Sequence, residues 1–131
     1  MVLVCGSRGW TDRSRIVAEL SHLPAGTLIL HGDAAGADRL AGDVAKNLGF
    51  GVWAMPYFSE YGKAGGARRN VAMLAILLAA RQHGYLVQVL AFTLGTPGTA
   101  HMIAQATKER VRVRTIKPEV PAAAPDRPTD E

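Results

Sequence analysis

Short apolar runs alternate along the chain with longer stretches in which apolar residues have helical spacing. The apolar runs predict strands at 2–5, 27–31, 51–55, 86–92 and 111–116. The stretches between them predict helices at about 12–22, 37–48, 67–82 and 99–109. Strands joined through helices form right-handed βαβ units and a parallel sheet. We therefore predict an α/β, Rossmann-like three-layer domain with a five-stranded parallel sheet, in the order 3-2-1-4-5.

Three of the predicted strands stop in small turns that contain glycine, at residues 6–9, 32–36 and 93–99. In a parallel sheet such turns emerge at the edge formed by the carboxyl ends of the strands, where ligands bind. Glycines let a ligand approach the backbone, and the helix that follows each turn presents N–H groups to an anion. This pattern indicates a binding site for a phosphorylated ligand.

Composition fits one globular domain, with 131 residues and 48% hydrophobic side chains. From Pro118 the chain is rich in Pro, Ala and acidic residues, so we assign 1–117 to the domain and 118–131 to a flexible tail. The chain has a formal net charge of +4; because the tail holds one of the 15 basic and four of the 11 acidic residues, residues 1–117 carry +7. A basic domain suits a phosphate-bearing partner, although solvated arginines alone explain this charge equally well.

No apolar run approaches the roughly 20 residues that span a bilayer. The N-terminus lacks a basic segment typical of a signal peptide, and a single cysteine excludes an internal disulfide framework. We therefore expect a cytoplasmic protein that does not associate with membranes. The segment Val71–Ala80 is apolar nearly all round, whereas a helix that covers one face of a sheet needs one apolar stripe. We expect a homodimer that buries this helix or its neighbours; a deeply central position of the helix within one chain is the alternative.

The first two turns carry side chains that suit either ligand contacts or structural roles. Arg8 has the geometry to pair with a phosphate, whereas Trp10 either stacks on a base or fills the interface between helix and sheet. The turn does not match the Gly-x-Gly-x-x-Gly dinucleotide fingerprint. His31 ends a strand and is interpreted as structural, and Asp38 lies in a first helical turn, where a carboxylate caps N–H groups. No second His or Cys lies near in sequence, so we predict no metal site and no required cofactor.

Residues 57–70 combine a long predicted loop, which ends at Gly66, with the start of the next helix. Their three aromatic and three cationic side chains are typical of a lid over a nucleotide. Arg68 and Arg69 lie at the start of the next helix, where cations oppose the helix dipole, so an anionic ligand would compensate them. In the last turn, Gly98 and Thr99 start a helix whose N–H groups and hydroxyl can face a phosphate; a simple turn with a Thr cap is the alternative.

Four segments together resemble the YspA-like, cpYpsA-related proteins of the SLOG superfamily. They are Gly-Ser-Arg-Gly-Trp at 6–10, His-Gly-x-Ala-x-Gly-Ala-Asp at 31–38, Gly-Lys-Ala-Gly at 62–65 with the Arg-Asn pair at 69–70, and Ala-Phe-x-x-Gly-x-x-Gly-Thr at 91–99. The resemblance covers about residues 2–115 and extends distantly to the LOG phosphoribohydrolases and to DprA, which binds single-stranded DNA.

The resemblance implies that a nucleotide or a nucleotide-derived molecule, of an ADP-ribose-like or cyclic-nucleotide-like kind, binds at the sheet edge. The candidate ligand-binding residues, with Trp10 included for its stacking option, are Gly6, Ser7, Arg8, Trp10, Gly32, Gly36, Asp38, Arg69, Asn70, Gly95, Gly98 and Thr99. LOG enzymes carry a Glu shortly after Gly-Thr, where this chain has His101. Glycosidic cleavage of that type needs a carboxylate, so no catalytic residue is assigned.

We therefore predict a protein that binds or senses a nucleotide-derived ligand. A hydrolase that cleaves a nucleoside phosphate or an N-glycosidic bond is the first alternative. Binding of single-stranded nucleic acid, suggested by the basic domain and by the resemblance to DprA, is the second.

Overall fold

The computed structural model describes residues 1–56, 62 and 65–118. The strands are β1 (Val2–Gly6), β2 (Leu28–His31), β3 (Gly51–Ala54), β4 (Gln88–Phe92) and β5 (Val113–Ile116). The helices are α1 (Arg13–Leu20), α2 (Ala37–Asn47), α3 (Gly65–Gln82) and α4 (Pro97–Lys108). The proposed tail, except Pro118, and most of the proposed lid at 57–64 lie outside the described residues.

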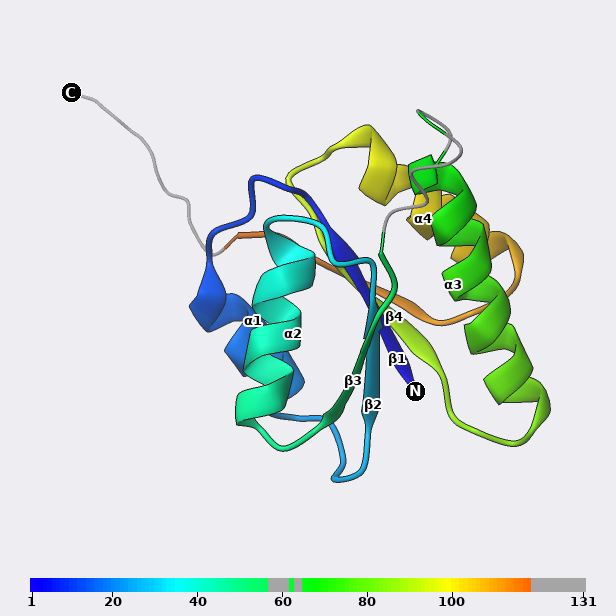
Figure 1. Cartoon of the computed structure of the whole chain (residues 1–131), viewed down its shortest axis with the longest axis horizontal. Helices are drawn as coiled ribbons and strands as arrows, with labels where there is room; N and C mark the ends of the chain where they lie inside the picture. Colours follow the sequence, from blue (N-terminus) through cyan, green and yellow to red (C-terminus); the bar gives the residue numbers. More distant parts are fainter. Residues whose placement is uncertain (57–61, 63–64, 119–131) are drawn as a thin grey trace.

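Within the described residues the strands form one parallel sheet in the order β3-β2-β1-β4-β5, which confirms the predicted fold (Figure 1). Most element ends agree with the sequence pattern within about two residues. Helix α4 starts at Pro97, two residues before the predicted start, because the fixed φ of proline suits the first position of a helix. Helix α3 starts at Gly65 instead of 67.

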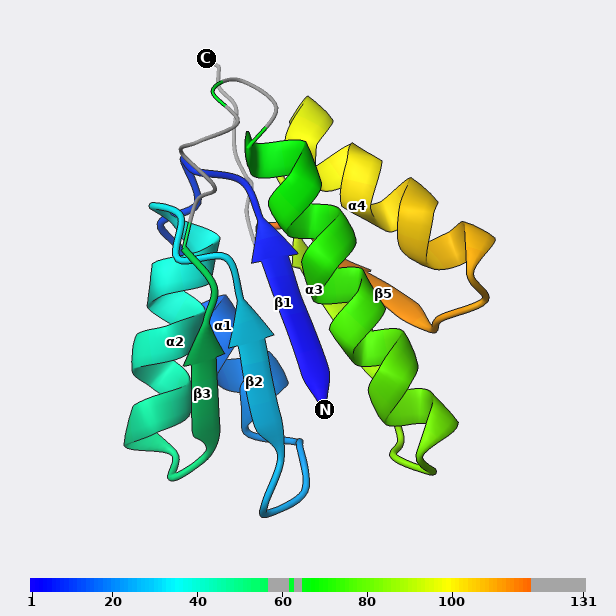
Figure 2. The same cartoon turned by 45° about the vertical axis from the view of Figure 1, so that its right-hand side comes forward.

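Successive residues of a strand point to opposite faces of the sheet, and each face has its own apolar cluster. Val2 and Val4 of β1 belong to the cluster under α1 and α2, whereas Leu3 and Cys5 belong to the cluster under α3 and α4. Figure 2 shows the two helix pairs on opposite sides of the sheet. The molecule thus has three layers, and within the described residues the connections that follow β1, β2 and β4 leave the sheet at the same edge.

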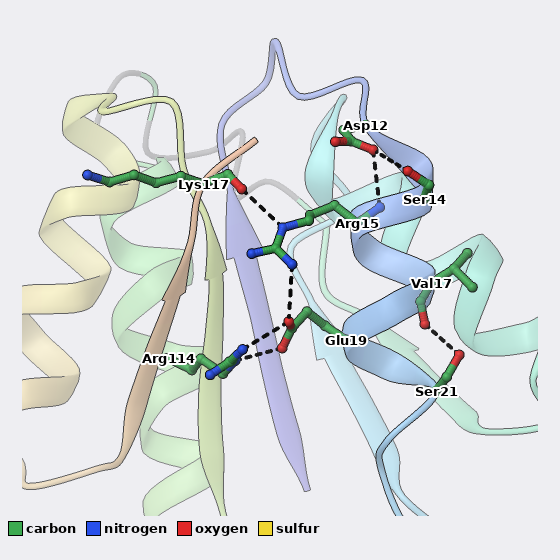
Figure 3. A network of polar contacts seen from close by, with 8 residues as sticks. All are labelled: Asp12, Ser14, Arg15, Val17, Glu19, Ser21, Arg114 and Lys117. Carbon is green, nitrogen blue, oxygen red and sulfur yellow. Dashed lines mark hydrogen bonds and ion pairs between the residues drawn. The ribbon is translucent and has the colours of Figure 1, made fainter. Parts of the chain in front are cut away.

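A network of charged side chains joins α1 to the edge strand β5 (Figure 3). Arg114 donates to both oxygens of Glu19, at 2.7 and 3.1 Å, and Arg15 lies 3.7 Å from the same carboxylate. The Arg15 Nε also donates to the carbonyl of Lys117 at 3.3 Å. Hydrogen bonding to Arg114 lowers the pKa of Glu19. The network attaches α1 to β5, the edge strand on the opposite side of the sheet from β3.

Helix α3 turns Met73, Leu74 and Leu77 toward the sheet and leaves Val71 55% exposed on its outer side. Its outward positions are therefore partly apolar, as the sequence predicted. No helix in the described residues is both long enough and apolar enough to cross a membrane.

Candidate functional site

A cavity of about 510 Å³ opens at the carboxyl edge of the sheet, between the β1 and β4 turns and the starts of α2, α3 and α4. This volume lies in the range of pockets that hold small molecules. Elements far apart in the sequence supply the lining side chains and backbone. They are Cys5, Gly6, Arg8, Gly9, Ala34, Asp38, Gly66, Ala67, Arg69, Asn70, Met73, Thr96, Pro97, Gly98, Thr99 and His101.

A second, shallower cavity of about 610 Å³ adjoins the first at the loop between β2 and α2. The two cavities share Arg8, Ala34 and Arg69, and the second adds Asp33 and Arg39. Arg8 is an exposed side chain between the two, so its guanidinium can reach an anion in either cavity.

Ser7 connects the parts of this edge although it does not line the cavity. Its hydroxyl accepts from the N–H of Leu94 at 2.8 Å and is hydrogen-bonded to the Thr96 hydroxyl at 2.8 Å. Its carbonyl accepts from the N–H of Ala37, the first residue of α2, at 3.3 Å. Ser7 thus holds the starts of α2 and α4 next to each other, and its 1% exposure indicates a positioning role.

Two glycines permit this close approach. A Cβ on Gly6 would overlap the Ala37 side chain and the Phe92 carbonyl oxygen, both of which are fixed in the fold. Gly36, with φ of 80°, adopts a left-handed conformation just before α2, and a Cβ there would overlap the carbonyl oxygens of Ser7 and Arg8. These two positions bring the β1 turn against α2.

Helix α4 begins at the cavity without a side-chain cap among the described residues. Thr96 occupies the N-cap position, but its hydroxyl bonds to Ser7 and, at 3.2 Å, to the Thr99 hydroxyl instead of to a helix N–H. In the described part of the chain the N–H groups of Gly98 and Thr99 have no protein acceptor. The positive end of the α4 dipole therefore faces the cavity, which favours an anion there.

Asp38 and Arg69 also line the cavity, and both are buried, with 5% and 9% exposure. The Asp38 Oδ2 accepts from the N–H groups of Gly32 at 3.0 Å and Ala34 at 3.3 Å. Arg69 Nη1 donates to the Gly32 carbonyl at 2.9 Å. Burial raises the pKa of Asp38 to about 6, although the two N–H groups and the charge of Arg69 act to lower it. Arg69 is therefore part of the fold of this edge as well as of the cavity wall.

His31 and Cys5 are held in their neutral forms. Burial lowers the pKa of His31, whose Nδ1 accepts from the N–H of Asp33 at 2.9 Å and so fixes the β2–α2 loop. Burial raises the pKa of Cys5, which disfavours a reactive thiolate. His31 has the structural position that the sequence indicated.

Of the predicted ligand-binding residues, the structure brings seven together in the cavity lining. These are Gly6, Arg8, Asp38, Arg69, Asn70, Gly98 and Thr99. Ser7, Gly32, Gly36 and Gly95 lie in the surrounding turns and do not line it. Trp10 is 1% exposed, packs edge-on against Phe92 at 5.5 Å and donates from Nε1 to the Asp12 carbonyl, so its ring fills the interface between helix and sheet.

Several lining residues were not singled out as ligand contacts from the sequence. Met73 follows Arg69 by four residues, and this spacing puts both on one face of α3, a signal that the sequence contained. Cys5 and His101 also line the cavity. His101 is exposed at the second turn of α4.

Two comparisons with known proteins identify what this chain is similar to. A family model described as the YspA, cpYpsA-related SLOG family matches residues 1–56, which contain β1 to β3 and the first two glycine turns. The chain is 34% identical over 123 residues to the Gene 61 protein of Mycobacterium phage D29, a match that covers 86% of this chain and 92% of the phage protein. That similarity therefore extends over most of the chain.

Proposed function

The chain belongs to the YspA, cpYpsA-related SLOG family, and from this premise we propose that it binds a nucleotide or a nucleotide-derived ligand at the carboxyl edge of its sheet. One observation carries the proposal: the uncapped start of α4 opens into a cavity that also presents the exposed guanidinium of Arg8. Helix N–H groups together with an arginine make a site for phosphate.

The rest of the cavity suits the remainder of such a ligand. With a phosphate on the N–H groups of Gly98 and Thr99, the sugar and base extend toward α3, where Met73 supplies an apolar surface and Asn70 an amide. The adjoining cavity gives room for a second charged part beside Arg8 and Arg39. Ligands of an ADP-ribose-like or cyclic-nucleotide-like kind suit a site divided in this way between a phosphate position at α4 and a sugar and base position at α3.

Hydrolysis of a nucleoside phosphate or an N-glycosidic bond is the second candidate, and one observation favours it. Asp38 places a carboxylate in the cavity wall, although it comes from α2 and not from the position of α4 where His101 stands. We favour binding without turnover, because one Asp38 oxygen already holds two backbone N–H groups. Incubation with AMP, followed by chromatographic detection of adenine, distinguishes hydrolysis from binding without turnover.

The binding proposal is tested by isothermal titration calorimetry with AMP, ADP-ribose and cyclic AMP at low and moderate salt. We expect one of these nucleotides to bind at a single site. Arg8→Ala should weaken the affinity for that nucleotide by about tenfold or more, which is the loss expected from one charge-assisted contact of roughly 1.5–3 kcal/mol.

Arg13→Ala is the matched control, because Arg13 is exposed and pairs with Asp43 outside the cavity. No binding by any of the three nucleotides would refute the proposal. Binding of single-stranded DNA with a steep salt dependence in their place would favour a nucleic-acid ligand.

We further propose that two copies of the chain associate through α3. Val71 on α3 and Trp53 on β3 are 55% and 44% exposed, and both are large apolar side chains on the α3 side of the molecule. A second copy that covers them would remove this apolar surface from water.

A further inference from the structure

The carboxylate of Asp38 uses only one of its oxygens to hold the fold. Both of its hydrogen bonds from backbone N–H groups, those of Gly32 and Ala34, go to Oδ2. The other oxygen, Oδ1, has no hydrogen-bond partner among the described residues, and Asp38 lines the cavity although its side chain is 95% buried, as its 5% exposure shows. An acceptor in this situation is available to a donor that enters the cavity.

The two contacts that Asp38 makes to the loop between β2 and α2 do not explain why a charged residue stands here. The N–H groups of Gly32 and Ala34 need one carbonyl-type oxygen, which an asparagine would supply without a buried charge. Burial raises the pKa of Asp38 even with Arg69 beside it, so the carboxylate destabilises the fold near neutral pH. A donor on a bound ligand would give this oxygen the hydrogen bond that the protein does not provide.

The position of Asp38 in the cavity restricts the chemistry of that donor. Ser7 holds the starts of α2 and α4 together, so the carboxylate lies on the same small site as the uncapped N–H groups of α4. A second phosphate close to Asp38 would meet a negative charge, whereas a hydroxyl would meet an acceptor. The site therefore fits a molecule that carries a phosphate and, a few atoms away, a hydroxyl.

We propose that Oδ1 of Asp38 accepts a hydrogen bond from a ribose hydroxyl of the bound ligand, so that the cavity selects ribonucleotides over deoxyribonucleotides. This inference rests on the proposed nucleotide-binding function. It also predicts poor binding of single-stranded DNA, which lacks the 2′-hydroxyl and presents additional phosphates.

The test compares AMP, 2′-deoxy-AMP and 3′-deoxy-AMP by calorimetry at pH 7.5. On the unmodified protein we expect AMP to bind at least about tenfold more tightly than one of the deoxy analogues, as the loss of a hydrogen bond to a charged group implies. This comparison needs no variant, so it does not depend on how a substitution folds.

Asp38→Asn then assigns the selectivity to this side chain. The asparagine oxygen can keep the contacts to Gly32 and Ala34, and the amide nitrogen replaces Oδ1 and cannot accept. We expect the preference for AMP to fall below about threefold in D38N. Asp43→Asn makes the same chemical change on the exposed side of α2, where Asp43 pairs with Arg13, and should leave the preference unchanged.

Three outcomes overturn the inference. If AMP and both deoxy analogues bind equally well, the ribose contact is absent but the proposed function stands. If D38N retains the full preference for AMP, another group provides it. If AMP fails to bind at millimolar concentration, this inference fails, and the proposed function is decided separately by ADP-ribose and cyclic AMP.

Discussion

Asp38→Asn should stabilise the protein near neutral pH, because it removes a buried charge whose ionised form the fold disfavours. The substitution keeps the size of the side chain and an oxygen for the N–H groups of Gly32 and Ala34. What it removes is the negative charge, which burial makes unfavourable despite the nearby Arg69. A residue that is kept at the expense of stability is expected at a functional site.

The size and the pH dependence follow from the pKa of Asp38, which is raised from 3.8 to about 6 in the folded protein. Well below pH 3.8 the carboxyl is protonated in both the folded and the unfolded chain, so the charge has no effect on stability. As the pH rises from 3.8 to about 6 the unfolded chain loses its proton first, and the folded state loses stability relative to it. Above pH 6 the loss is constant, and two pKa units correspond to roughly 3 kcal/mol.

Urea denaturation at about pH 3 and at pH 7.5 measures this difference. We expect the free energy of unfolding of D38N to exceed that of the unmodified protein by about 1–3 kcal/mol at pH 7.5, and the two to converge at about pH 3. The Asp43→Asn control should show no comparable gain. A D38N protein that is less stable at pH 7.5 would refute the reasoning, since it would mean that the charge stabilises the fold through Arg69.

Three further outcomes follow from the same contacts. Gly6→Ala should lower the free energy of unfolding, measured in urea, by roughly 1–3 kcal/mol, because the added Cβ would overlap the Phe92 carbonyl. Gly98→Ala is the control and should have no such effect, because its Cβ would meet open space. Equal effects of the two substitutions would contradict the packing described for the β1 turn. Arg69→Ala should weaken nucleotide binding by about tenfold or more while the protein stays folded. Some stability should be lost, because the Gly32 carbonyl loses its donor. Unchanged affinity by calorimetry would count against an anion beside Arg69. Light scattering should report a dimer that Val71→Asp disrupts, and a monomer at high concentration would remove that proposal.

We also expect no adenine release from AMP in a chromatographic assay. His101 stands at the position where the resemblance to LOG enzymes places a glutamate, and an imidazole does not stabilise an oxocarbenium ion as a carboxylate does. Robust release would promote the hydrolase to the first candidate.

The fold was predictable from the sequence because its signals are local and repeated. The alternation of apolar runs with helical spacing fixes a parallel sheet, and the glycine turns must then share one edge. The same reasoning predicted that Gly6, Arg8, Arg69 and Gly98 lie together, and all four line one cavity.

What the sequence did not settle depends on which way a side chain turns and on partners far along the chain. Ser7 was expected to contact ligand, but its hydroxyl bonds to Thr96, 89 residues away, and no local pattern signals that pairing. Trp10 had two readings until its ring was found against Phe92. For Asp38 the spacing indicated a helix cap, which is wrong: in the described part of the chain α2 has no side-chain cap hydrogen bond, and Oδ2 instead accepts from Gly32 and Ala34 in the loop before the helix.

The central claim is that a nucleotide phosphate binds at the start of α4, and NMR observes that position directly. In a ¹H–¹⁵N correlation experiment with the ¹⁵N-labelled protein, titration with AMP or ADP-ribose should give the largest shifts at the backbone amides of Gly98 and Thr99, with smaller shifts at Arg8. The same titration on Arg8→Ala should need more ligand for the same shifts. Shifts confined to other parts of the molecule, or none at millimolar nucleotide, would contradict the account.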